Sequence, residues 1–368
     1  KNLAYLVFTD RGGDRIERAA LGAGGDSRLY DIFGATEDLR GFVEERDPKN
    51  IAVNMSDYLG TADGLSHTNY LALVKALGEK YAARLISSER LVSDFRSSRV
   101  ASEISVFRKS LELTGQLVER ALSNEVIKPG VTTLGDLSFW IADQLIARGH
   151  VPSYGTPRII YPEIPTDEDG RPLVRAPTRG PRNKVINRGD LVGWDFGIRM
   201  LGGFSTDIER WAYVLREGET DVPETIQAAW DHGLKVREIC YKLTQPGRTA
   251  LETLNLMYDK LKELGYEICY LEDQTSDSRN IEVNIGWHSV GEQGHGSGPA
   301  VWIDEEQPYS SKLMIKPTQL TSIEFFVYYP VPEWDGWKMR MDFEENMIIT
   351  ENGIEWLYPP TERINLIR

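Results

Sequence analysis

The sequence predicts an α+β protein of two domains, a smaller α/β domain over residues 1–97 and a larger domain over residues 98–368. Three observations support this prediction. A length of 368 residues corresponds to about two domains. Strand-like runs alternate with short helical stretches near the N-terminus, and a long helix is predicted directly after them. An internal repeat then divides the rest of the chain into two similar halves.

The N-terminal region alternates between the two kinds of element. The runs Leu3 to Thr9 and Ile51 to Asn54 are typical of strands, whereas residues 37–45 and 69–77 have helical character. The long helix after them is indicated by apolar residues that recur at spacings of three, four and seven: Ile104, Phe107, Leu111, Val118 and Leu122. We place the domain boundary just before this helix, near Ser97.

The internal repeat consists of KPGVTTLGDL, from Lys128 to Leu137, and QPGRTALETL, from Gln245 to Leu254. The two segments share Pro, Gly, Thr, Leu and Leu in register, and the threonine is expected to cap a helix that follows. Helical patterns flank both copies, over residues 100–124 and 133–148 and over residues 223–243 and 249–264. One interpretation is a common helix–turn–helix joint. The other is a pseudo-two-fold repeat with an active site between its halves.

Between the two helix pairs, the sequence predicts a hairpin with an aspartate on each strand. Residues 191–199 form the first strand, residues 201–203 the turn, and residues 206–215 the return strand. Asp195 and Asp207 lie in apolar surroundings, where carboxylates are costly unless they are paired or bind a metal. The alternative is a half-exposed hairpin with both aspartates on the surface. Two facing buried aspartates would repel each other, and a divalent cation between them would remove the repulsion.

Three more side chains extend this set. Glu324 lies in the apolar run SIEFFVYYP, and Glu344 precedes Met347-Ile348-Ile349. His295 lies between glycines in GEQGHGSGPAVW. Four carboxylates and one imidazole suit two divalent cations of the Mn, Co, Fe or Zn type. Two such cations can activate a water molecule and polarise a carbonyl group.

A second histidine, His288, lies in the strand-like run NIGWHSVG. One interpretation is a core histidine hydrogen-bonded to the backbone. The other is a catalytic group that stabilises an oxyanion or protonates a leaving amine. Arg340, four residues before Glu344, is expected to orient that carboxylate through a charge-assisted hydrogen bond.

Composition excludes several classes of partner. The net charge of −14 disfavours binding to nucleic acid or to an anionic membrane surface. No apolar run approaches the ~20 residues of a membrane span. Cys240 and Cys269 have no metal-ligand spacing and are expected to be small buried apolar residues. We expect a soluble protein, cytoplasmic or exported with a signal segment removed.

The order Asp195, Asp207, His295, Glu324, Glu344 resembles that of the pita-bread metallopeptidases, which include methionine aminopeptidase, Xaa-Pro aminopeptidase, prolidase and creatinase. The resemblance covers residues 99–368, and residues 33–97 resemble the end of a creatinase-type N-terminal domain. It implies a pita-bread catalytic domain, two divalent cations (manganese, or cobalt, zinc or iron) and a homodimer. The resemblance further implies that the two aspartates and His295 are metal ligands. It also implies that Glu324 is a ligand and the general base, and that Glu344 bridges both metals.

The resemblance is greatest to an Xaa-Pro-aminopeptidase-like subgroup with His288, Gly298-Pro299 and Trp334-Asp335-Gly336 at these positions. This chain departs from the family at three histidine positions, and the first is that His288 lies further upstream than the usual second histidine of the motif. The segment upstream of Asp195 has no histidine, and Arg175 or Arg179 is the candidate there for binding an anionic group. Trp302 stands where the family has a histidine seven residues after the ligand, and it is a candidate substrate contact.

The leading hypothesis is a dinuclear-metal hydrolase that cleaves an amide bond, as an Xaa-Pro-type aminopeptidase or dipeptidase. A small peptide or amide is then the substrate. The first alternative keeps the metals and makes the substrate a small non-peptide molecule that is hydrolysed or cleaved. The second alternative is a binding protein on the same fold that has no catalytic activity.

Overall fold

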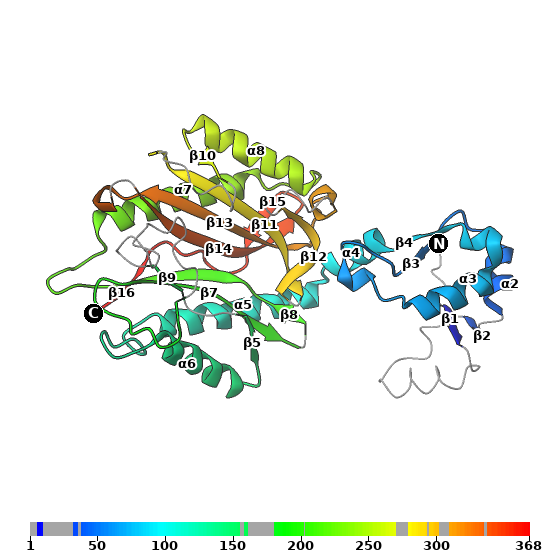
Figure 1. Cartoon of the computed structure of the whole chain (residues 1–368), viewed down its shortest axis with the longest axis horizontal. Helices are drawn as coiled ribbons and strands as arrows, with labels where there is room; N and C mark the ends of the chain where they lie inside the picture. Colours follow the sequence, from blue (N-terminus) through cyan, green and yellow to red (C-terminus); the bar gives the residue numbers. More distant parts are fainter. Residues whose placement is uncertain are drawn as a thin grey trace, which may run out of the picture. The chain divides into compact units, whose positions relative to one another are not determined.

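The computed structural model describes most of the chain: residues 6–9, 32–35, 38–154, 158–160, 180–201, 203–269, 279–292, 294–301, 309–334 and 337–368. It divides into two compact units, Lys1–Ser93 and Asp94–Arg368 (Figure 1). The boundary between these units lies close to the one predicted near Ser97. Among the described residues, no helix is long and apolar enough to cross a membrane.

The first unit combines two short parallel strand pairs with helices. Strand β1 (Leu6–Thr9) pairs with β2 (Ile32–Ala35), and β3 (Ile51–Val53) pairs with β4 (Leu85–Ser87). The helices are α2 (Leu39–Arg46) and α3 (His67–Ala82), with the short 3-10 helix η3 (Gly60–Ala62) before α3. Val43, Leu77 and Tyr81 form its small core. Helix α4 (Glu89–Ser97) spans the boundary between the units.

The second unit contains two sheets, each covered by a pair of helices. The first sheet has β7 (Leu191–Met200) paired with β9 (Ile208–Val214), together with β5 (Val151–Tyr154), β6 (Arg158–Ile160), β8 (Phe204–Ser205) and β16 (Asn365–Ile367). Helices α5 (Ala101–Ala121) and α6 (Leu134–Ile146) share a core with this sheet.

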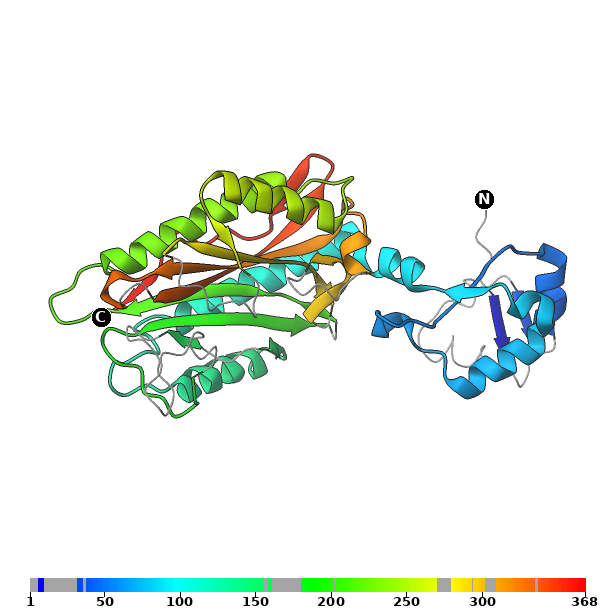
Figure 2. The same ribbon diagram turned by 45° about the horizontal axis from the view of Figure 1, so that its top comes forward.

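The second sheet is built on the antiparallel order β11 (Glu282–Glu292), β13 (Leu320–Pro330) and β14 (Lys338–Thr350). Strands β10 (Glu267–Ile268), β12 (Gly294–Val301) and β15 (Gly353–Trp356) extend it. Two short 3-10 helices, η4 (Ser310–Lys312) and η5 (Pro332–Trp334), precede and follow β13 in the chain. Helices α7 (Glu224–Leu243) and α8 (Ala250–Glu263) share its core. Figure 2 shows the resulting order: helices on the outside and the two sheets between them.

The internal repeat predicted from the sequence is visible in these helix pairs. Gly130 and Gly247 both take the left-handed conformation that suits glycine, with φ of 76° and 88°. Thr249 caps α8 in a capping box with Glu252, as predicted. The cap of α6 is instead Thr133, one residue after the threonine that the two segments share in register. The hydroxyl of Thr132 donates to the carbonyl of Val126.

The hairpin of β7 and β9 has a register that differs from the predicted facing pair of aspartates. Asp195 lies directly opposite Glu209, and Phe196 lies opposite Ile208. Asp207 lies just before β9, so it is a diagonal neighbour of Asp195 on the same face of the hairpin. Cys240 and Cys269 are free and buried, as expected.

Candidate metal centre

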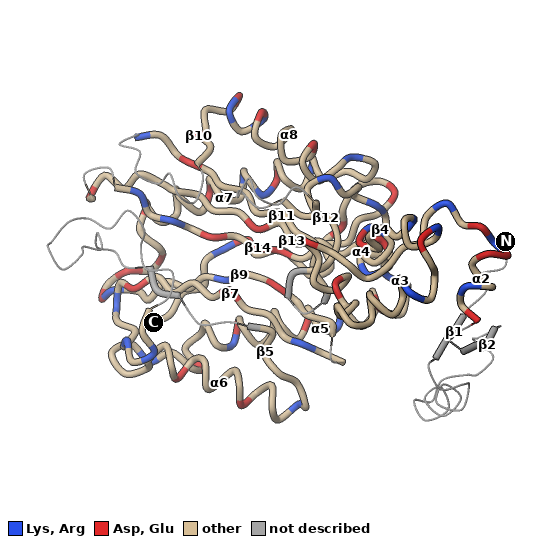
Figure 3. Tube along the Cα trace, turned by 45° about the vertical axis from the view of Figure 1, so that its right-hand side comes forward, with Lys and Arg blue, Asp and Glu red and all other residues tan. Residues whose placement is uncertain are grey.

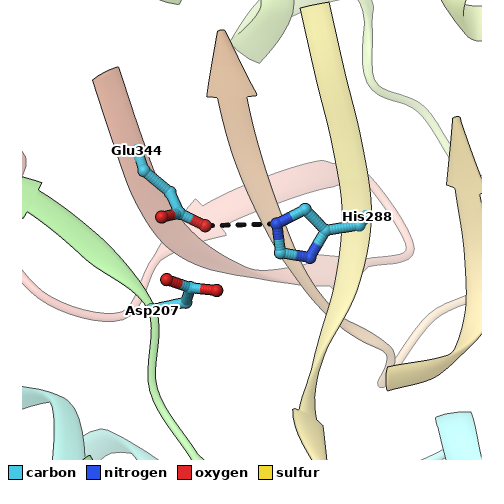
Figure 4. Close-up of side chains that lie close together, drawn as sticks. All are labelled: Asp207, His288 and Glu344. Carbon is cyan, nitrogen blue, oxygen red and sulfur yellow. Dashed lines mark hydrogen bonds and ion pairs between the residues drawn. The ribbon is translucent and has the colours of Figure 1, made fainter. Parts of the chain in front are cut away.

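Three side chains from separate strands meet between the two sheets. Asp207 lies just before β9, His288 lies on β11, and Glu344 lies on β14 (Figure 4). One ligand atom from each lies within 4.8 Å of the other two. All three side chains are buried, at 2%, 0% and 2% exposure. This arrangement is a candidate binding site for a cation.

Strand register brings Glu324 to the same place. Glu324 lies directly opposite Glu344 across β13 and β14, and opposite Gly286 across β11 and β13. Its Oε2 lies 3.6 Å from His288 Nε2. The Glu324 side chain is 14% exposed, more than the side chains of His288 and Glu344. It is therefore the most accessible of these three groups.

The ring of His288 is held in one orientation. Its Nδ1 lies 3.1 Å from the carbonyl oxygen of Ser289, which can only accept, so Nδ1 is the donor. Its Nε2 lies 3.1 Å from Glu344 Oε1 and faces the carboxylates. In metal sites, a hydrogen bond from one ring nitrogen to a carbonyl commonly fixes the other nitrogen as the ligand. His288 has this arrangement.

The structure describes only the backbone of His295. That residue lies on β12, opposite Val290 of β11. Its predicted role as a metal ligand stays a prediction.

A hydrogen-bond network holds Asp207 and Glu344 in position. The Asn346 side chain accepts from the backbone N–H of Asp207 (2.9 Å) and donates to the backbone oxygen of Asp207 (2.6 Å). It also donates to Ser322 Oγ at 3.1 Å, and Ser322 Oγ donates to Glu344 Oε1 at 2.8 Å. Asn346 and Ser322 therefore tie the segment that carries Asp207 to the strand that carries Glu344.

Burial and charge shift the pKa values of this cluster. Burial raises the pKa of Asp207 well above its usual value, and the negative charges of Glu344, Glu324 and Glu209 raise it further. Burial alone would raise the pKa of Glu344, but hydrogen bonding to His288 and the charge of His288 lower it overall. Burial alone would lower the pKa of His288, but Glu324 and Glu344 raise it to about 10. Without a bound cation, His288 is therefore protonated, and its positive charge lies beside Glu324 and Glu344.

The residues fit a divalent cation. The Oδ1 atom of buried Asp207 has no hydrogen-bond partner among the described residues. A buried carboxylate oxygen without a partner is costly, and a cation would satisfy it. Carboxylate oxygens with one imidazole nitrogen form a donor set that suits manganese, cobalt, iron or zinc.

Several predicted site residues cannot be placed in this centre. Arg175, Arg179 and Trp302 lie outside the described residues, as do Asp335 and Gly336. Arg340 donates two hydrogen bonds to the carboxylate of Asp342, at 2.6 and 2.8 Å. The role of Arg340 toward Glu344 stays a prediction.

Sequence reasoning assigned no role to three residues beside the candidate centre and did not consider a ligand role for a fourth. Ser322, Asn346 and Glu209 are buried next to the predicted ligands and received no role. His288 was considered as a core or catalytic histidine and not as a ligand. One signal could have found it: like Asp195 and Glu324, it lies inside an uninterrupted apolar strand, whereas His295 lies among glycines.

Comparisons with known proteins identify the same fold. The model of metallopeptidase family M24 matches residues 105–351. The structure is similar to an X-Pro aminopeptidase from Thermotoga maritima (TM-score 0.61, 16% identity, 100% of this chain and 88% of that chain). It is also similar to an Xaa-Pro dipeptidase from Bacillus anthracis (TM-score 0.63, 18% identity, 100% and 87%). A third similar structure is a prolidase from Pyrococcus furiosus (TM-score 0.57, 18% identity, 97% and 88%). No curated protein sequence matches the chain.

Proposed function

The chain belongs to metallopeptidase family M24, and on that premise we propose that it is an Xaa-Pro-type aminopeptidase or dipeptidase that uses two divalent cations. The predicted pita-bread fold and the prediction of a metallopeptidase-like hydrolase are confirmed by the family match and the similar structures. The creatinase-type character of the first unit stays a prediction, as do manganese and the homodimer.

The observation that carries the proposal is the convergence of Asp207, His288 and Glu344 within 4.8 Å in a buried place. Adjacent strands add Asp195 and Glu324, which makes four carboxylates and one imidazole. Figure 3 marks acidic positions along β9 and β14 inside this unit. Two divalent cations bound here supply Lewis-acid polarisation of a carbonyl and lower the pKa of a water molecule.

We assign the histidine ligand to His288 in place of His295. The Nδ1 hydrogen bond of His288 to the Ser289 carbonyl leaves Nε2 directed at the carboxylates. His295, seven residues along, then becomes the candidate for the proton donor to the leaving amine. The roles that the sequence resemblance implied for the two histidines are thereby exchanged.

Glu324 is the proposed general base. It lies beside His288 and Glu344, and its side chain is more exposed than theirs. A general base must lie within hydrogen-bond reach of the water molecule whose proton it accepts, so an accessible carboxylate at the edge of the buried cluster suits this role. Asp207 and Glu344, which are sealed from solvent, suit the role of fixed ligands.

Two variants test the exchanged histidines. We expect His288→Gln to lose at least one bound cation and all activity. We expect His295→Gln to keep both cations and lose activity. Cation content measured by mass spectrometry after dialysis against Mn²⁺ separates these outcomes. Loss of cations from His295→Gln with full retention by His288→Gln would return the ligand role to His295.

Hydrolysis of Xaa-Pro dipeptides and tripeptides with added Mn²⁺ tests the substrate class. We expect turnover of peptides with a proline at the cleaved bond. A panel of small amides and ureas is the comparison. Turnover of that panel, without turnover of any peptide, would favour the alternative of a small non-peptide substrate.

A further inference from the structure

A second group of polar side chains lies on the hairpin face that carries Asp195. Side chains two residues apart on a strand share a face, so Gly197 and Arg199 of β7 lie on the same face as Asp195. The residues between them, Phe196 and Ile198, pack on the other face into the core that α5 and α6 share. Arg199 therefore extends from the same side of the sheet as a predicted metal ligand.

Two serines flank Arg199 on this face. Ser205 of β8 lies directly opposite Arg199 in the pairing of β7 and β8, and opposed residues of an antiparallel pair point to the same side. Ser153 of β5 lies over Gly197, since its Cβ atom would be 3.3 Å from a Cβ added to that glycine. The three strands lie side by side in the first sheet (Figure 1). One guanidinium and two hydroxyl groups therefore share one part of the hairpin face.

Each of these three side chains has a buried polar atom without a hydrogen-bond partner in the part of the chain that the structure describes. The atoms are Arg199 Nε, Ser205 Oγ and Ser153 Oγ. Ser205 is 0% exposed, whereas Arg199 and Ser153 are half-buried. Buried polar atoms without a partner are costly and rare, and three of them in one place indicate a group that a ligand completes. The half-buried side chains of Arg199 and Ser153 leave this place accessible from solvent.

The chemistry of the three groups suits a carboxylate. A guanidinium is always charged and presents its N–H donors in a planar fork that matches the two oxygens of a carboxylate. Each serine hydroxyl can donate one further hydrogen bond. A metal cation would be repelled by Arg199, so this group is not a further metal site.

The position of the group relates it to the candidate metal centre. Ser205 precedes Asp207 by two residues, which is about 7 Å along an extended chain. One residue of an extended peptide spans about 3.3–3.6 Å. When the amide bond to be cleaved lies at the metal centre, a carboxylate on a residue next to that bond comes within reach of the long side chain of Arg199.

We propose that Arg199, Ser205 and Ser153 bind a carboxylate group of the substrate. This inference rests on the proposed function and specifies its substrate as a short peptide with a carboxylate on a residue next to the cleaved bond. Two sources supply such a group: the C-terminal carboxylate of a dipeptide, and the side chain of an acidic residue. In both cases Arg199 holds the substrate and takes no part in the chemical step, so its loss should raise KM and change kcat little.

The substitution Arg199→Gln tests the proposal with three peptides in the presence of Mn²⁺. Ala-Pro has a terminal carboxylate, Asp-Pro amide has a side-chain carboxylate, and Ala-Pro amide has neither. We expect Arg199→Gln to raise KM by about 10- to 100-fold for a peptide whose carboxylate is bound, the range for a hydrogen bond to a charged group. KM for Ala-Pro amide should not change. A rise for Ala-Pro identifies the terminal carboxylate as the bound group, and a rise for Asp-Pro amide identifies the acidic side chain.

Two further variants accompany this test. Ser153→Ala removes one hydroxyl from a half-buried position and should raise KM for the same peptide by a smaller factor, so it keeps the test valid if Arg199→Gln does not fold. Arg148→Gln is the matched control, because Arg148 is an exposed arginine just after α6 that donates to the backbone oxygen of Gln144. It should leave KM unchanged for all three peptides. Melting temperatures of the variants check that each is folded.

The possible failures can be told apart. If the unaltered chain hydrolyses none of the three peptides, the proposed function is wrong, and this inference falls with it. If the unaltered chain is active and folded Arg199→Gln has an unchanged KM for both peptides that carry a carboxylate, this inference alone is overturned. An equal rise in KM for Ala-Pro amide would also overturn it, because that peptide has no carboxylate to lose.

Discussion

Asn346 shows how one amide can fix the geometry of a candidate metal ligand, Asp207. It makes both an accepting and a donating hydrogen bond to the backbone of Asp207, and a third bond to Ser322. Its own exposure is 1%. Because Asp207 lies just outside β9, these bonds replace the ladder contacts that would otherwise position it.

The substitution Asn346→Ala should therefore lower both stability and cation affinity. It leaves the buried N–H and carbonyl of Asp207 without partners, and each such group costs about 1–3 kcal/mol. Urea denaturation in EDTA measures the first effect, and Mn²⁺ calorimetry measures the second. Asn352→Ala, in the exposed turn after β14, is the control. Unchanged Mn²⁺ affinity in Asn346→Ala would mean that this network does not position Asp207.

His232 on α7 predicts a pH dependence that is separate from the metal centre. Burial and the charge of Lys235 lower its pKa, and its Nδ1 lies 2.9 Å from the hydroxyl of Tyr266. The unfolded chain then binds the proton more readily than the folded chain, so stability is lost as pH falls through the ordinary histidine range. His232→Gln should flatten the profile of unfolding free energy between pH 8 and pH 5, about the range in which an ordinary histidine titrates. An equal decline in both proteins would contradict this origin.

The sequence could identify individual acids but not their neighbours across strands. Asp195, Asp207, Glu324 and Glu344 were found because carboxylates are costly in apolar strands. The proposed ligand role of His288 draws on the pairing of β11 with β13, which sets His288 opposite Ser322. Such long-range register is not encoded in local spacing. Glu209 was missed for the same reason, because only the hairpin register sets it opposite Asp195.

At the scale of elements, the predicted bounds were most accurate for helices whose apolar periodicity extends over many residues. The four helices of the larger unit begin and end within a few residues of their predicted bounds. The cap of α6 was displaced by one residue, because Thr132 and Thr133 are both capable of capping and the local sequence does not choose between them. The strand register also explains why Asp195 lies opposite Glu209 and not opposite Asp207 as predicted.

The same hairpin requires glycine at position 197. A Cβ atom there would lie 1.8 Å from the backbone oxygen of Thr206, next to Asp207. Since backbone cannot yield as a side chain can, Gly197→Ala should cost at least about 3 kcal/mol, at the upper end for overpacking. Gly203→Ala, where a Cβ would meet nothing within 4 Å, is the matched control in the same hairpin. Chemical denaturation measures both, and equal stabilities would contradict the close approach of β7 to Thr206.

At the scale of the whole second unit, its two halves are joined through side chains as well as through backbone. Trp211 of β9 donates from Nε1 to the backbone oxygen of Asp342 on β14, at 2.7 Å. Arg210 pairs with Glu345 at 3.1 Å, with side chains 3% and 4% exposed. Glu345 also accepts from the backbone N–H of Thr361 at 2.7 Å. Arg210 and Glu345 directly follow Glu209 and Glu344 in the chain, so the junction of the halves also affects the spacing of the candidate metal centre.

The buried pair of Arg210 and Glu345 gives the prediction that tests this junction. Arg210→Met leaves Glu345 with Arg237, at 3.9 Å, as a more distant cation, and should cost about 3–5 kcal/mol, as for other buried pairs with one partner removed. Glu345→Met should cost a similar amount.

The double variant should be less destabilised than the sum of the two single variants by about 0.5–3 kcal/mol, because it leaves no lone charge at the pair. Urea denaturation measures the cycle. The exposed pair of Lys242 and Glu238 is the control and should show a coupling of at most about 1 kcal/mol. Strict additivity at the buried pair would mean that the ion pair of Arg210 and Glu345 does not couple the two halves.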